Sequence, residues 1–254
     1  MSWKLAAISL ALVWRNIGAA VLVSLVPAAA ALVLSLGIFA ALGVRPGMLT
    51  FALAFGGWSG RVAAALALAA VVVILAAAWA AVGWHRFVLR GEQPGIVPRL
   101  DARLVGDYAL RSTVISVVLL VLLFPVSAMG MQMLAMVGLG GLALARLALA
   151  FAMTALMAFL WLRLALILPG LVLGHRVSVA ESWAATGTRT EEVLGASSIL
   201  VGLDLVLSSL LDIAPLGVWP GLLLRLALVW VMTLAGAGLL SLIYRDLIEG
   251  RRLR

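Results

Sequence analysis

Long apolar stretches alternate with short polar ones along this chain, a pattern that predicts membrane-spanning helices. A helix needs about 20 apolar residues to cross a hydrocarbon layer of about 30 Å. Residues 112–145 hold no charge over 34 positions, which exceeds one span, and GLGG at 138–141 supplies a turn between two helices. We therefore place six spans at residues 17–42, 62–84, 112–137, 142–166, 193–213 and 221–244.

The same pattern predicts the fold class. Unpaired backbone amides in hydrocarbon cost several kcal/mol each, so helices and closed barrels are the structures that span membranes. No segment alternates apolar and polar positions as a barrel strand would. We expect an all-α membrane protein with a single transmembrane domain over residues 1–254. AGAG at 235–238 marks a place where small residues would let two helices cross closely.

Three short amphipathic stretches precede the predicted pairs of spans, at residues 2–16, 98–112 and 177–192. In the third, Ser178 and Glu181 have the spacing of a capping box. We therefore predict three helical hairpins, each preceded by a short interfacial amphipathic helix.

One arginine lies near the end of each pair, at positions 86, 163 and 245, with spacings of 77 and 82 residues. The spacing favours a threefold internal repeat. The alternative is that any hairpin protein has positive inner ends, which would produce the same similarity.

Composition agrees with a lipid environment. The chain is 65% hydrophobic and 11% charged, whereas soluble domains are about 45–50% apolar and about 25% charged. It contains no cysteine, which excludes disulfides, thiolate metal sites and thiol nucleophiles. The net charge of +8 does not indicate nucleic-acid binding, because no basic run is interleaved with aromatic residues.

Positive charge also predicts the orientation of the spans. Of the 18 Lys and Arg residues, 13 fall on one side of the predicted membrane, 4 fall on the other, and Arg163 is left over. The positive-inside rule then makes both termini cytoplasmic, in a multi-pass protein of a bacterial inner membrane. A cleaved signal peptide is disfavoured, since WRN at 14–16 interrupts the first apolar run and a full-length span follows it.

Arg163 and Asp204 are the polar groups that most need an explanation. If Arg163 matches Arg86 and Arg245, it lies at the inner boundary, and the apolar stretch after it, bent at Pro169, lies along the interface or under the bundle. If the outer turn falls nearer Arg146, Arg163 lies deeper and must snorkel or find a carboxylate.

Asp204 lies eleven residues into the fifth span, where a carboxylate is costly and usually faces the interior. Three alternatives stay open for it: a pair with Arg163, a protonated acid against Ser hydroxyls or a backbone carbonyl, or a lining group of a polar path. Asp212 and Arg225 lie near the outer face on adjacent helices, and we expect a structural ion pair between them.

No arrangement of residues points to an enzyme or a cofactor. His85 and His175 lie at span ends among charges, where an interfacial histidine needs no ligand, although two such histidines on facing helices could bind a b-type haem or a pigment. No His/Glu cluster has metal-site spacing, and no phosphate-binding loop or nucleophile–base set is evident.

One stretch resembles a known group of proteins. WLRLALILPGLVLGHRVSVAESWAATG at 161–187, and to a lesser degree AWAAVGWHRFVLRGE at 78–92, is similar to the membrane domain attached to some glycerophosphoryl diester phosphodiesterases and to bacterial inner-membrane proteins like it. The resemblance implies six helices with interfacial linkers. It implies no activity, because the catalytic domain of those fusions is absent from this sequence.

Two classes of function remain. The first is a non-enzymatic accessory, scaffold or lipid-organising protein, whose partners are membrane lipids and other membrane subunits. The second is a small transporter or channel that uses Asp204, suggested also by prolines within spans and by the repeat. A polar cavity that reaches Asp204 would favour transport, and a sealed bundle would favour the accessory function.

Overall fold

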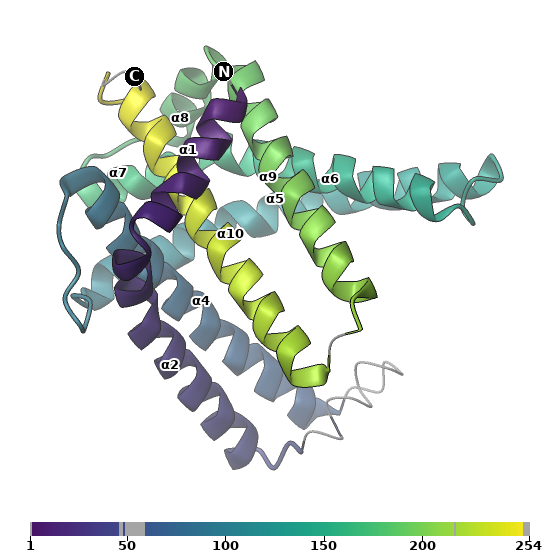
Figure 1. Cartoon of the computed structure of the whole chain (residues 1–254), viewed down its shortest axis with the longest axis horizontal. Coiled ribbons are helices and arrows are strands. Elements are labelled where there is room, and N and C mark those ends of the chain that lie inside the picture. Colours follow the sequence, from purple (N-terminus) through teal and green to yellow (C-terminus); the bar gives the residue numbers. More distant parts are fainter. Residues whose placement is uncertain (1, 46–47, 49–58, 216, 251–254) are drawn as a thin grey trace.

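The computed structural model describes residues 2–45, 48, 59–215 and 217–250, and the regular structure of these residues is helical (Figure 1). Arg251, Arg252 and Arg254, which contribute to the predicted charge bias, lie outside them. The helices are α1 (Ser2–Arg15), α2 (Ile17–Ala41), α4 (Gly60–Arg90), α5 (Ala102–Met136), α6 (Ala143–Leu164), α7 (Ile167–Leu173), α8 (Val179–Gly187), α9 (Thr190–Ile213) and α10 (Val218–Leu247).

Six of these segments are long and apolar enough to cross a membrane: Ile17–Ala41, Gly60–Arg90, Ala102–Met136, Ala143–Leu173, Thr190–Ile213 and Pro220–Leu247. The chain is therefore an all-helical, multi-pass membrane protein. The helices extend past several of the predicted span limits. In α4, for example, the helix continues through six further residues after Trp84 and ends at Gly91, whose φ of 69° suits glycine.

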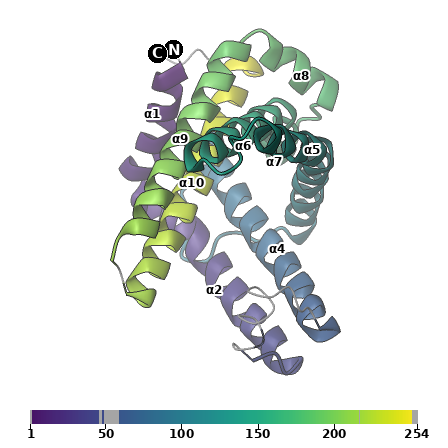
Figure 2. The ribbon, with the colours of Figure 1, turned by 90° about the vertical axis from the view of Figure 1, so that its right-hand side faces the viewer.

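The long helices gather at one end of the molecule and diverge toward the other (Figures 1 and 2). Consecutive long helices contact each other, α2 with α4, α5 with α6, and α9 with α10, and α9 packs more extensively against α6 than against α10. The pair α5–α6 runs away from the other two pairs in Figure 1. The start of α1 and the end of α10 lie together (Figures 1 and 2). We call the end where α4, α6 and α10 finish and where α1, α7 and α8 lie the closed end.

Buried residues concentrate at the closed end. Trp84, Leu166, Leu168, Leu240 and Tyr244 are fully enclosed there. Farther out, large apolar side chains are exposed, as expected for surfaces that contact lipid. The protein core is therefore confined to the region where the three pairs meet.

The predicted tight crossing at AGAG is present at the closed end. A methyl group added at Gly238 of α10 would lie 3.3 Å from Leu12 of α1 and 3.4 Å from the indole nitrogen of Trp84. Because a side chain there would meet both neighbours, glycine lets α10 approach α1 and α4 at once.

The apolar stretch after Arg163 forms the short helix α7, which is buried at the closed end. The chain breaks at Ala165 and Leu166, before Pro169, so the proline does not cause the bend. Pro169 lies in the first turn of α7, where its missing N–H would have no helical partner. A side chain at Gly170 would lie 2.9 Å from Val177, so the following loop fits closely over α7.

Two of the three amphipathic stretches form separate helices. A break at Asn16 separates α1 from α2, and the Asn16 side-chain amide donates to the carbonyl of Leu12 over 2.8 Å. A complete capping box starts α8: Glu181 N–H donates to Ser178 Oγ over 3.1 Å, and Ser178 N–H donates to the Glu181 carboxylate over 2.7 Å. The hydrogen bonds from Ser178 lower the pKa of Glu181 below its ordinary value.

The prediction of a separate helix is wrong for the second stretch. Asp101 caps α5 by accepting from Leu104 N–H over 3.0 Å, and the helix then runs without a break to Met136. No proline interrupts residues 102–112, and the amphipathic stretch becomes the first turns of a 35-residue helix.

Candidate functional site

Arg163 lies half-buried in the last turn of α6, at the closed end. Its Nη2 donates to the carbonyl of Trp183 over 2.8 Å, and its Nε donates to Thr186 Oγ1 over 3.2 Å. The guanidinium carbon lies 3.6 Å from the centroid of the Trp183 ring, a close cation–π contact. The partners of this arginine are therefore an aromatic ring and two oxygens of α8.

Ser182 completes the contact between α8 and the break that follows Arg163. It is fully buried, donates to the carbonyl of Arg163 over 2.6 Å and accepts from Leu166 N–H over 3.3 Å. A break in a helix frees backbone groups, and because Ala165 and Leu166 are fully buried these groups must find partners within the protein. One serine hydroxyl satisfies both sides of the break, which explains why α8 packs here.

The structure does not bring Arg163 and Asp204 together. Arg163 is directed to α8, and Asp204 forms no ion pair or hydrogen bond with any residue in the described part of the chain. Of the three alternatives for Asp204, the pair with Arg163 is therefore wrong.

Asp204 instead lines a groove of about 400 Å³ between α6, α9 and α10, together with Thr154, Ser197 and mainly apolar side chains. A second groove, of about 580 Å³, lies between α4, α5, α6 and α10. Met157, Trp161, Met232 and Gly236 line both grooves. A cavity thus reaches Asp204, but its wall is mostly apolar and it is open rather than sealed.

Asp212 and Arg225 are brought together across the turn that joins α9 to α10, in an ion pair between Asp212 Oδ1 and Arg225 Nη2. Their side chains are 63% and 46% exposed. An ion pair this exposed contributes little to stability in water. It joins the end of α9 to the start of α10 and does not line either groove.

The histidines occupy positions that the sequence did not indicate. His85 is fully buried; its Nδ1 lies 2.7 Å from Ser241 Oγ, and its Nε2 lies 3.0 Å from the hydroxyl of Tyr108. Ser241 donates to the carbonyl of Ala237 over 2.9 Å, so it accepts from an Nδ1–H tautomer of the imidazole. The expectation of an interfacial histidine among charges is wrong for His85.

The two tyrosines of the chain bind its two histidines. Tyr244 on α10 meets Nδ1 of His175 at 3.1 Å, just after α7. Both ring nitrogens of His85 are hydrogen-bonded within the protein, which leaves neither free to bind a haem or pigment metal. Among the described residues, no three His, Asp or Glu side chains form a group that could hold a metal ion.

No family model, curated protein or solved structure matches this chain. The function must therefore be argued from the grooves, the closed end and the charges.

Ser182→Ala should lower the free energy of unfolding by about 1–3 kcal/mol, because it leaves two buried backbone groups of the α6–α7 break without a partner. Thr188→Ala is the matched control, since the Thr188 hydroxyl is exposed and donates only to a carbonyl of its own helix. Thermal unfolding in detergent measures both. Equal losses in the two variants would show that Ser182 does not stabilise the break.

Proposed function

We propose that this protein is a non-enzymatic integral component of a bacterial inner membrane, where it acts as an accessory or lipid-organising subunit. The observation that carries the proposal is the pair of grooves between the diverging helix pairs. A membrane enzyme would need a set of reacting side chains, whereas these walls are mostly apolar and carry one carboxylate, that of Asp204.

The size and lining of the grooves suit apolar molecules. Binding sites for small molecules typically measure about 300–1,000 Å³ and are mostly apolar with a few polar groups, and both grooves fall in this range. On α5, Ser112, Thr113 and Ser116 line the larger groove. We infer that lipid acyl chains occupy the grooves and that the hydroxyls accommodate the more polar part of the molecule.

The orientation belongs to the same proposal. Arg86, Arg163 and Arg245 lie near the ends of α4, α6 and α10, which all finish at the closed end. The positive-inside rule then places the closed end and both termini in the cytoplasm. Three hairpins, with the interfacial helices α1 and α8 before the first and the third, would give this arrangement.

Membrane lipids are the primary partners in this proposal, with other membrane subunits as further partners and with no cofactor or nucleic acid. The arginines of the closed end favour anionic headgroups. Purification from native membranes in a mild detergent, followed by identification of co-purifying subunits and lipids, distinguishes an accessory subunit from a protein that acts alone.

Gly236→Leu should reduce the number of lipids that remain bound after purification by at least half. Gly236 lines both grooves, and a side chain there meets no atom within 4 Å, so leucine fills the space without a clash. Gly37→Leu is the matched control, because Gly37 is an exposed, unobstructed glycine within α2. Native mass spectrometry counts the bound lipids. Unchanged lipid retention in Gly236→Leu would contradict the proposal.

The second candidate is a small transporter or channel, favoured by the position of Asp204 on a groove wall, where it has no partner among the described residues. In that case the protein in liposomes would conduct protons or cations, and Asp204→Asn would abolish the flux because it removes the charge or the exchangeable proton. A pH-sensitive dye inside the liposomes reports proton flux. A flux equal to that of empty liposomes would exclude this candidate for protons.

A further inference from the structure

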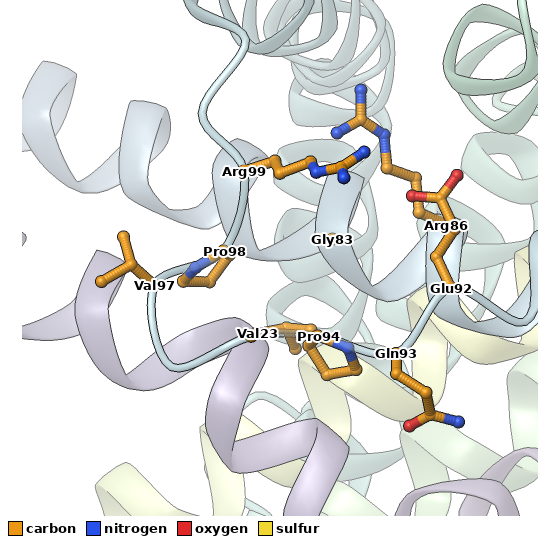
Figure 3. Close-up of a pocket in the computed structure, with 10 residues that line it drawn as sticks. Val23, Gly83, Arg86, Glu92, Gln93, Pro94, Val97, Pro98 and Arg99 are labelled. Carbon is orange, nitrogen blue, oxygen red and sulfur yellow. The ribbon is translucent and has the colours of Figure 1, made fainter.

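A separate pocket lies at the closed end, between α2, α4 and the loop that follows α4 (Figure 3). The loop after α4 folds back over α2 and α4 and encloses about 480 Å³. Val23 of α2 and Gly83 of α4 form its floor, while Pro94, Val97 and Pro98 of the loop form its walls. The pocket is built from three parts of the fold and none of its residues lines the grooves.

The loop is held in place at both of its ends. Gly91 ends α4 with a left-handed φ of 69°, which turns the chain back. Arg90 donates to the carbonyl of Leu173 over 3.1 Å and lies 3.5 Å from the carboxylate of Glu92. Asp101 caps α5 at the other end of the loop. These contacts and the two prolines make the pocket a formed feature and not a chance gap.

Two guanidinium groups enter this pocket. Arg86 from α4 and Arg99 from the loop point toward one another in Figure 3, and the carboxylate of Glu92 lies beside Arg86. Within the described residues, neither arginine forms an ion pair. The two arginines and one carboxylate leave a net positive charge.

Arg86 also has an unsatisfied donor. Its Nε is shielded from solvent and has no hydrogen-bond partner among the described residues. Buried N–H groups in proteins are nearly always paired, so the protein itself leaves the hydrogen-bonding capacity of Arg86 incompletely used. An anion with several oxygens would accept from the guanidinium groups of Arg86 and Arg99, which both line the pocket.

The proposed orientation puts this pocket near the phosphate groups of the inner leaflet. Val23 and Gly83 belong to apolar spans, whereas Glu92 and Arg99 lie beyond the end of α4. A phospholipid that enters here would place its phosphate at the arginines and the start of its chains against the apolar floor.

We propose that the pocket between Arg86 and Arg99 binds a phosphate group, as borne by an anionic phospholipid or by free phosphate. This inference deepens the proposed lipid-organising function, but it concerns a surface separate from the grooves. Gly236→Leu should therefore lower total lipid binding but leave the preference for a phosphate-bearing lipid unchanged, so that either proposal can fail without the other.

The experiment measures binding of phosphatidylglycerol to the full-length protein in detergent by native mass spectrometry, with diacylglycerol as the lipid that lacks phosphate. Arg86→Gln and Arg99→Gln should each weaken phosphatidylglycerol binding about tenfold, which corresponds to one charge-assisted hydrogen-bonded contact. Arg103→Gln is the matched control, because Arg103 is exposed and close in sequence but does not line the pocket. Its affinity should stay within about twofold of the unmodified protein.

Glu92→Gln should raise the affinity for phosphatidylglycerol, whereas the arginine variants lower it. Misfolding would not raise this affinity. Loss of this carboxylate removes repulsion of the phosphate, so affinity should rise a few fold. Arg99→Gln, an exposed loop substitution, keeps the test decisive if Arg86→Gln does not fold.

Two further outcomes show whether the phosphate group comes from a lipid or from free phosphate, and whether the proposal is wrong. If inorganic phosphate at millimolar concentration displaces phosphatidylglycerol and binds with the same dependence on Arg86 and Arg99, the site serves free phosphate. If phosphatidylglycerol binds no better than diacylglycerol and inorganic phosphate does not bind, the proposal is wrong. It is equally wrong if Arg86→Gln and Arg99→Gln behave like Arg103→Gln.

Discussion

The absence of water from the hydrocarbon layer is the constraint on which this structure depends. Each backbone group that a helix break frees must find a partner within the protein. Between α6 and α7 that partner is Ser182, and Arg163 adds two hydrogen bonds and a ring contact with α8. Because the helix breaks there, α7 can lie buried beneath the ends of the long helices. The short amphipathic helix α8 thus stabilises the closed end by satisfying the break.

Similar contacts join the other pairs at the same end. The first turns of α5 meet α4 through Tyr108 and His85, α8 meets the end of α6, and α1 meets α10 at Gly238. The start of α5 thus packs on α4, α8 packs on α6, and α1 packs on α10. In each case, the segment that precedes a pair of long helices contacts the last helix of another pair. Because these ties act at one end, the pairs diverge beyond it and leave the grooves between them (Figures 1 and 2).

Much of this fold could be predicted because lipid imposes a simple pattern on the sequence. Uninterrupted apolar runs marked the spans, and GLGG marked the turn where α5 ends at Met136 and α6 begins at Ala143. The partners of the buried polar groups could not be predicted. A carboxylate was one expected partner of Arg163, but Arg163 contacts the ring and the carbonyl oxygen of Trp183. His85 forms a hydrogen bond with Ser241, which lies 156 positions later in the sequence. Such contacts depend on how distant helices cross, which no local pattern encodes.

The most direct test of this account is the side of the membrane on which each end of the helix pairs lies. The chain has no cysteine, so Gln93→Cys, in the loop at the closed end, and Leu139→Cys, in the turn between α5 and α6, provide unique labelling sites. A membrane-impermeant maleimide applied to intact spheroplasts should label the Leu139→Cys variant at once and the Gln93→Cys variant only after permeabilisation. Labelling of both variants from the outside, or of Gln93→Cys alone, would contradict the threading and the functions inferred from it.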